Sequence, residues 1–217
     1  MTSPPVPLPT DPTELGIARA AAYFERFEPG KAASTLEPVL SADPRSAAGW
    51  LLLARVRLTL DQPEAALDAA NRAVELLPGD PRPPATASRA LTMLGRHDDA
   101  ITMAYRAVIS EPENPMWHDR VAWALLAADR HLADAEQAAR TAVGLDPNEA
   151  HYYFTHGVAL DALGHTDQAR QALLISLRLE PENPVAQRRL ATLDGQIRDD
   201  APVVRKRGWS LFKRKKD

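Results

Sequence analysis

The chain has 217 residues, of which 45% are hydrophobic and 25% charged, with a formal net charge of −3 and no cysteine. The lack of cysteine excludes disulfides, Cys-ligated zinc and thiolate catalysis, and it suits a reducing compartment. The first ten residues have neither the basic cluster nor the apolar stretch of a signal peptide. Because no apolar run approaches the roughly 18 residues that cross a bilayer, we expect a cytoplasmic protein without a spanning segment.

Prolines mark the ends of helical patterns at nearly constant intervals of 34, 34, 35 and 34 residues. They are Pro44, Pro78, Pro112, Pro147 and Pro181. A period of this length predicts helix pairs that stack on one another and bury one continuous apolar seam. We therefore divide the chain into a proline-rich, disordered arm (1–12), an array of helix pairs with a capping helix (13–197) and a flexible basic tail (198–217).

Small residues recur at two positions of this repeat, one in each helix of a pair. The earlier set is Ala20, Ala54, Ser88 and Gly157, and the later set is Ala32, Ala66, Ala100, Ala135 and Ala169. Two helices approach to about 8 Å only where the side chains between them are small. We therefore expect the two helices of each pair to cross at these positions.

Helix boundaries are marked by polar residues that precede a proline, because such side chains can cap the N–H groups of the following helix. These residues are Asp11, Asp80, Asn114 and Asn183. Gly95 and Gly164 occupy matching turns inside their pairs, where a residue with positive φ ends the first helix at little cost.

Two departures from the repeat lead to further expectations. Pro83 and Pro84 open the third unit, which predicts a short first helix there. The fourth unit contains one extra residue, which we place in the turn near residues 129–132.

These residues together resemble the tetratricopeptide repeat family, whose pattern includes alanines at the crossing and a proline at position 32. The fifth unit fits the pattern well through Tyr153, Gly157, Leu160, Ala169 and Pro181. The chain resembles bacterial members of the family, and this resemblance implies an all-α, right-handed α-solenoid of about five helix hairpins. A final helix from Pro184 to about Ile197 would cover the last apolar face.

In this family the first helices of successive units line a concave groove, and the resemblance implies a set of groove residues here. They are Ile17, Ala21, Phe24, Leu51, Arg55, Leu58, Arg82, Arg89, Trp123, Phe154 and Val158. Such a surface suits a peptide or amphipathic helix of a partner protein, with a carboxylate near Arg55 or Arg89. The alternative is that these side chains only pack against neighbouring helices. Ile17 and Ala21 replace the Lys and Asn with which one branch of the family grips chaperone tails, so that role is disfavoured.

Catalytic, cofactor and metal motifs are missing from the sequence. The six histidines form no H-E-x-x-H pair, and no phosphate-binding glycine loop or G-x-S-x-G is present. We therefore expect a non-catalytic scaffold or adaptor without cofactor or metal. Two alternatives remain open: a structural component that self-associates through the helix at 15–24, and a nucleic-acid-associated regulator.

The C-terminal tail is basic, whereas the rest of the chain is acidic. From Arg198 onward the chain has eight basic and three acidic residues, a net charge of +5. The preceding 197 residues have a net charge of −8. The tail residues of interest are Arg205, Lys206, Arg207, Trp209, Leu211, Phe212, Lys213, Arg214, Lys215 and Lys216. Bases that flank aromatic groups suit an anionic membrane surface, at the inner face. The alternatives are nucleic acid, which the acidic body disfavours, a protein-docking motif, and a solubilising end that binds nothing.

Removal of the tail tests the membrane hypothesis. We expect full-length protein to sediment with anionic vesicles and a chain that ends at Asp200 to remain in the supernatant, because each base near the lipid contributes about 1 kcal/mol. Equal sedimentation of the two proteins would refute it.

Overall fold

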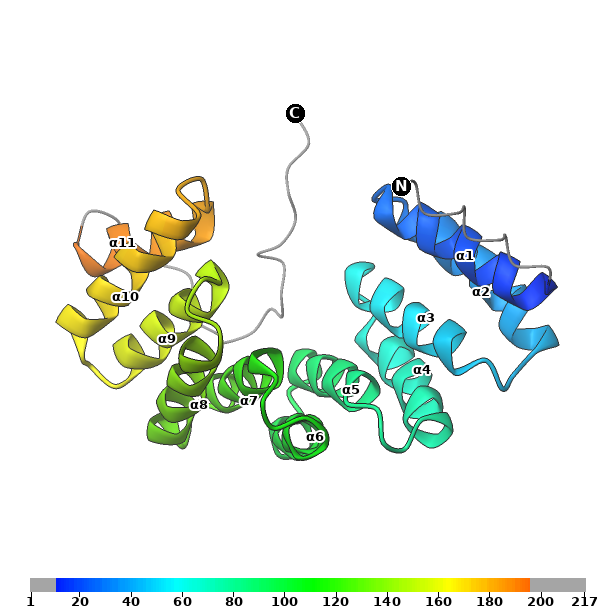
Figure 1. The fold of residues 1–217 in the computed structure, drawn as a ribbon, viewed down its shortest axis with the longest axis horizontal. Coiled ribbons are helices and arrows are strands. Elements are labelled where there is room, and N and C mark those ends of the chain that lie inside the picture. The colour runs from blue at the N-terminus through cyan, green and yellow to red at the C-terminus, as the bar shows by residue number, and fades with distance from the viewer. Residues whose placement is uncertain (1–10, 196–217) are drawn as a thin grey trace, which may run out of the picture. The chain divides into compact units, whose positions relative to one another are not determined.

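The computed structural model describes residues 11–195, which form an all-α fold in two compact units that meet in sequence between Ala90 and Leu91 (Figure 1). Within these residues there are eleven helices, packed as sequential hairpins, as the repeat predicts. None of them has the length and apolar character required to cross a membrane. The predicted basic tail and most of the predicted N-terminal arm lie outside the described residues.

The first unit contains two complete hairpins and the start of a third. Its helices are α1 (Pro12–Glu25), α2 (Pro29–Ala42), α3 (Ala47–Thr59), α4 (Pro63–Leu76) and most of α5 (Arg82–Met93). Helix α1 packs on α2 and α3 packs on α4, while α2 and α1 also contact α3. The first helices α1 and α3 therefore lie next to one another.

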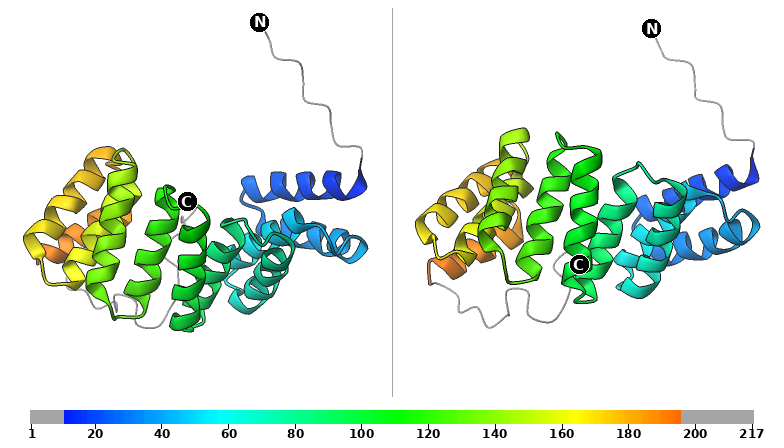
Figure 2. Two further views of the ribbon diagram at one scale, coloured as in Figure 1. Left: turned by 60° about the horizontal axis from the view of Figure 1, so that its bottom comes forward. Right: turned by 90° about the horizontal axis from the view of Figure 1, so that it is seen from below.

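The second unit continues the same arrangement, as Figure 2 shows for its green to orange helices. Its helices are α6 (His97–Ser110), α7 (Pro115–Ala127), α8 (Leu132–Leu145), α9 (Ala150–Ala162), α10 (Thr166–Leu179) and α11 (Pro184–Leu193). Each helix from α6 to α11 contacts the next one, and α7 also contacts α9. The first helices α7 and α9 are thus neighbours in this unit.

The small residues of the repeat are buried, as predicted. Ala20, Ala54 and Ser88 in first helices are fully inaccessible, and Gly157 is buried. In the second helices the fully inaccessible residues are Ala32, Ala66, Ala100, Ala135 and Ala169. An ideal Cβ on Gly157 would lie 3.0 Å from Cγ of Leu173 and 3.2 Å from the carbonyl oxygen of Ala169. Helices α9 and α10 therefore approach so closely that Gly157 leaves no room for a methyl group without a local shift.

The predicted caps are confirmed. Carboxylate Oδ2 of Asp11 accepts a hydrogen bond from the N–H of Glu14 at 3.0 Å, and amide Oδ1 of Asn183 accepts from the N–H of Val185 at 3.1 Å. Asn114 caps α7 in the same way, and Asp80 accepts from the N–H of Arg82 at 2.8 Å. Each cap satisfies a backbone donor that the first turn of a helix leaves without a partner.

The first helix that contains Pro83 and Pro84, α5, has 12 residues and is the shortest of the five, but by only one residue against α3, α7 and α9 and by two against α1. Both prolines lie in the first turn of α5. The first four N–H groups of a helix have no partner within it, so proline removes no hydrogen bond there.

The extra residue of the fourth unit lies in the turn between α7 and α8, as predicted. This turn has four residues, 128–131, whereas the turns inside the other hairpins have three. Asp129 and His131 adopt positive φ values of 51° and 55°. Gly95 and Gly164 supply the positive φ in two of the shorter turns, also as predicted.

The capping helix is confirmed as α11, which ends at Leu193. Leu193 packs against the apolar cluster of Leu160, Ala169 and Ala172 at the end of the last hairpin. Arg170 of α10 donates from Nε to Oδ1 of Asp194, just past α11, at 2.7 Å. Helix α11 thus covers apolar surface that α9 and α10 would otherwise expose.

Substitution of two helical glycines tests the close approach of α9 and α10. Gly144 has no atom within 4 Å of an ideal Cβ, so Gly144→Ala should raise the free energy of unfolding by up to about 1 kcal/mol through helix propensity. Gly157→Ala should show no such gain, and Gly157→Val should lower stability by about 1–3 kcal/mol because it overpacks the contact with Leu173. Chemical denaturation measures all three variants, and a gain in both alanine variants would contradict the packing.

Candidate functional site

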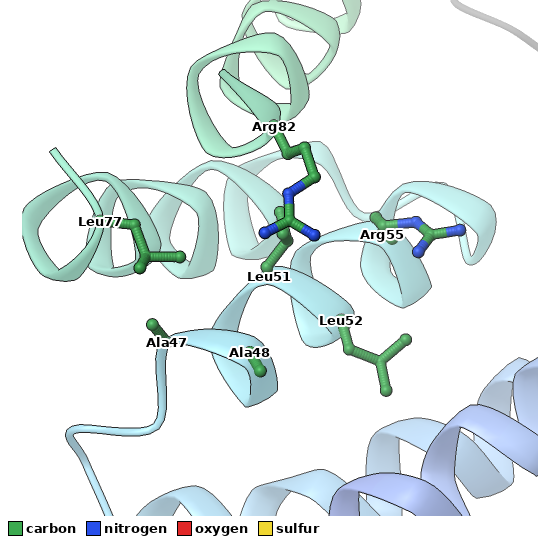
Figure 3. Close-up of a pocket in the computed structure, with 7 residues that line it drawn as sticks. All are labelled: Ala47, Ala48, Leu51, Leu52, Arg55, Leu77 and Arg82. Carbon is green, nitrogen blue, oxygen red and sulfur yellow. The ribbon is translucent and has the colours of Figure 1, made fainter. Parts of the chain in front are cut away.

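A hollow of about 470 Å³ opens in the first unit among α3, α4 and α5 (Figure 3). Its lining residues are Ala47, Ala48, Leu51, Leu52, Arg55, Leu77 and Arg82. Five of these side chains are apolar and two are guanidinium groups. The hollow therefore combines an apolar floor with positive charge.

Arg55 of α3 lines one side of the hollow with an exposed side chain, and in Figure 3 its guanidinium extends away from Arg82 and Leu77. Its guanidinium carbon lies 5.5 Å from the centroid of the Phe24 ring of α1. A guanidinium over an aromatic face is attracted by the ring quadrupole, which favours this placement of the Arg55 side chain. Within residues 11–195, no carboxylate forms an ion pair with Arg55.

Arg82 enters the hollow from the start of α5, where it pairs with Asp80. The Nε of Arg82 donates to Oδ1 and Oδ2 of Asp80 at 2.9 and 3.0 Å. These hydrogen bonds hold the pKa of Asp80 below its usual range, although partial burial opposes them. Asp80 thus both caps α5 and fixes the base of the Arg82 side chain.

Arg89 lies two turns further along α5 and is half-buried. Burial lowers its pKa from the ordinary value, and the positive charge of Arg55 lowers it further. Like charges raise each other's free energy when they lie close together. The lowered pKa of Arg89 thus reflects its burial first and the charge of Arg55 second.

In the second unit, a buried carboxylate joins the two neighbouring first helices. Asp119 of α7, which is 7% exposed, accepts a hydrogen bond at Oδ1 from the hydroxyl of Thr155 of α9 at 2.6 Å. Its Oδ2 lies 3.3 Å from Nε2 of His151, also on α9. Thr155 is fully inaccessible, so this network is part of the packing between α7 and α9.

Aromatic rings surround His151. The ring of Trp123 stacks on the imidazole at a centroid distance of 6.4 Å and an interplanar angle of 23°, and the ring of Phe154 lies at 6.4 Å. Burial by itself lowers the pKa of His151, but the hydrogen bond to Asp119 and the negative charge of that carboxylate outweigh it, so the pKa is raised above 6.5. Glu149 adds to the rise, and Arg120 opposes it.

Nearby carboxylates also affect the pKa of Tyr152, the residue that follows His151. Burial raises the pKa of Tyr152 to about 12, and the carboxylates of Asp119, Glu149 and Asp146 contribute. The face of α7 and α9 near Asp119 is therefore acidic, whereas the hollow of the first unit is basic.

His156 belongs to a different contact. Its Nε2 lies 2.9 Å from Oε1 of Glu136, which joins α9 to α8 rather than to α7. Both side chains are largely buried, with 18% and 15% exposure. His151 and His156 thus lie on different faces of α9, as the five-residue spacing predicts.

Family models show what these hairpins are. Models described as tetratricopeptide repeat match residues 23–83, 87–150 and 150–183. The chain belongs to the tetratricopeptide repeat family. No curated protein matches it in sequence.

Solved structures of other tetratricopeptide repeat proteins share the fold. The chain is similar to TTC0263 of Thermus thermophilus, with a TM-score of 0.73, 17% identity and coverage of 83% of this chain and 98% of that one. PilF of Pseudomonas aeruginosa has a TM-score of 0.69 and 20% identity, with coverage of 84% of each chain. YrrB is described as a TPR protein with an unusual peptide-binding site. Its TM-score is 0.60 at 17% identity, with coverage of 81% of this chain and 90% of that one. At these identities the similarity establishes the fold alone.

The tetratricopeptide repeat groove residues named from the sequence fall into several environments. Leu51, Arg55 and Arg82 line the hollow, and Phe24 lies beneath Arg55. Four of the named residues are half-buried: Ile17, Ala21, Arg89 and Trp123. Four are at least nine-tenths buried: Leu51, Leu58, Phe154 and Val158. The basic tail named from the sequence lies outside the described residues.

Sequence reasoning missed the network of Asp119, Thr155 and His151. Thr155 and His151 follow Asp119 by 36 and 32 residues, about one repeat length. Residues one repeat apart lie on neighbouring first helices of this family, so polar groups at such spacings in groove-facing positions could have revealed the pair.

The pairing of His151 with Asp119 makes the stability of this tetratricopeptide repeat protein depend on pH. Because the pKa of His151 is raised on folding from 6.5, the stabilisation is complete below pH 6.5 and is lost as pH rises through the folded pKa. We expect His151→Gln to remove this step from the free energy of unfolding, measured by chemical denaturation between acidic and alkaline pH. The exposed His165 offers a control, since His165→Gln should keep the step. Identical pH profiles for wild type and His151→Gln would contradict the assignment.

Proposed function

We propose that the chain is a non-catalytic adaptor that holds a peptide or helix of a partner protein against its first helices. Tetratricopeptide repeat proteins generally mediate protein–protein interactions, and one structural relative, YrrB, is described as having a peptide-binding site. Membership of the family supports protein binding in general, and the hollow of the first unit supports the more specific proposal.

The hollow lies where the family pattern places ligand contacts. Leu51, Arg55 and Arg82, which the sequence assigns to the groove, all line it. Leu51 and Arg55 are four residues apart on α3, so both side chains lie on the same face of that helix. The coincidence of predicted groove residues with an observed hollow is the observation that carries the proposal.

The chemistry of the hollow suits recognition of a polypeptide. Its apolar side chains can bury an aliphatic or aromatic anchor, and the Arg55 guanidinium can pair with a polar group of the ligand. Its lining contains no Ser, His, Asp or Glu, so it offers neither a nucleophile nor a general base. These features support binding rather than catalysis.

The basic tail supports a second part of the proposal, which is reversible attachment of the adaptor to the inner face of an anionic membrane. The support is the charge of +5 in the last twenty residues and the aromatic groups between the bases. The vesicle experiment described above tests this part separately.

Charge reversal at the hollow tests the adaptor function. Arg55→Glu should release partners that are captured by the tagged full-length protein, with at least about a tenfold loss of affinity for a purified partner, because it reverses an exposed charge at the hollow. The matched control is Arg72→Glu on α4, where the arginine side chain is 66% exposed and does not line the hollow. Quantitative mass spectrometry of captured proteins and calorimetry with a purified partner provide the readouts.

Two results would contradict the adaptor function. One is the same set of captured proteins with wild type, Arg55→Glu and Arg72→Glu. The other is an equal loss of captured proteins with Arg55→Glu and Arg72→Glu. Circular dichroism during thermal unfolding establishes that Arg55→Glu remains folded.

A further inference from the structure

The hollow of the first unit carries more positive than negative charge. Arg55 and Arg82 line it, and Asp80 is the carboxylate held by Arg82. Of the two lining arginines, Arg82 is paired with this carboxylate, whereas Arg55 forms no ion pair within residues 11–195. A ligand with negative charge would be attracted, and a ligand with positive charge would be repelled.

The charge of Arg82 is already engaged. Both carboxylate oxygens of Asp80 accept hydrogen bonds from its guanidinium, so the pair presents an orientated but largely neutralised group. A ligand at this end of the hollow would meet the apolar side chains that line it beside this pair.

Arg55 is in a different situation. It lines the hollow, is exposed, and is held against the ring of Phe24 rather than against an acid. Arg72, another exposed arginine of this unit, instead has an acidic partner, Glu75, at 3.5 Å. An arginine that is stacked on an aromatic ring keeps its planar N–H edge available for a carboxylate, which it can bind with two parallel hydrogen bonds.

Apolar side chains accompany this charge. Leu51, Leu52 and Leu77 line the same hollow as Arg55 (Figure 3). A ligand that pairs with Arg55 therefore lies against an apolar floor, where partial exclusion of water strengthens a charged hydrogen bond. The hollow fits a ligand with both an acidic and an aliphatic group within one or two turns of peptide.

We propose that the hollow binds an internal acidic segment of a partner protein, in which a Glu or Asp side chain pairs with Arg55 and an adjacent aliphatic side chain rests on Leu51 and Leu77. This inference deepens the adaptor function proposed above and depends on it. The carboxylate belongs to a side chain within a continuing segment, because such a segment can contact the apolar lining residues as well as Arg55.

Synthetic peptides test the inference with the full-length protein. The probes are fluorescent peptides of about twelve residues, acetylated and amidated, in which leucines at helical spacing are flanked by Glu, together with versions in which every Glu is replaced by Gln. Fluorescence anisotropy measures the Kd of each peptide. We expect at least one Glu peptide to bind about tenfold more tightly than its Gln version, with a difference that shrinks as salt concentration rises.

Two variants separate the role of Arg55 from general charge. Arg55→Gln should bind the Glu and Gln peptides equally, and Arg72→Gln, which removes an exposed charge outside the hollow, should keep the preference of wild type. Arg55→Lys should retain part of the preference, since it keeps the charge but loses the bidentate geometry. Thermal unfolding followed by circular dichroism confirms that each variant is folded.

Each other outcome overturns the inference in a recognisable way. Equal binding of Glu and Gln peptides by wild type, or a preference that survives Arg55→Gln, removes the pairing with Arg55 but leaves peptide binding intact. Tighter binding of peptides with a free terminal carboxylate than of amidated ones shows that the source is a chain end. If no peptide binds while partner capture still depends on Arg55, the acidic segment is wrong and the adaptor function stands.

Discussion

The structure depends on close contact between helices at small side chains. In the hairpins α1–α2, α3–α4 and α9–α10 the crossing point is formed by small residues, such as Ala20 and Ala32 or Gly157 and Ala169. Backbones that approach this closely place many atoms at van der Waals distance, and the larger residues beside the crossing, such as Leu36 and Leu173, become fully inaccessible. A bulky residue at any crossing would separate a pair and open the contact between neighbouring hairpins.

Polar contacts add specificity to this packing. In the second unit, Asp119 of α7 contacts Thr155 and His151, which both lie on α9. In the first unit, Arg57 of α3 pairs with Glu37 of α2. A buried carboxylate that lost these partners would remain desolvated, at a cost of roughly 1–3 kcal/mol. Such a penalty disfavours any packing of α7 on α9 in which Asp119 does not face Thr155.

The sequence predicts the architecture well because its determinants are periodic. The alanines, the prolines and the capping residues Asn114 and Asn183 each act within one hairpin, and each recurs at the repeat interval. The environment of each site residue is harder to predict, because it depends on the neighbouring side chain in three dimensions. Phe154 fits a groove position but is 9% exposed, since Trp123 and His151 pack against it.

The prolines illustrate the same limit. Pro83 and Pro84 look disruptive as residue types, yet their position in the first turn of α5 makes them harmless. Position within a helix, not composition, decides the effect of proline. Likewise Arg55 and Arg72 are equivalent as residue types, and only the structure shows that one stacks on Phe24 while the other pairs with Glu75.

The four-residue turn between α7 and α8 shows that spacing inside a hairpin can vary without disturbing the helices on either side. Asp129 and His131 absorb the added length in the left-handed region, and Ala124 and Ala135 on the two sides remain buried. Such a junction is a natural place for insertion of a short reporter sequence or a spectroscopic label, because neither helix needs to rotate to accommodate it.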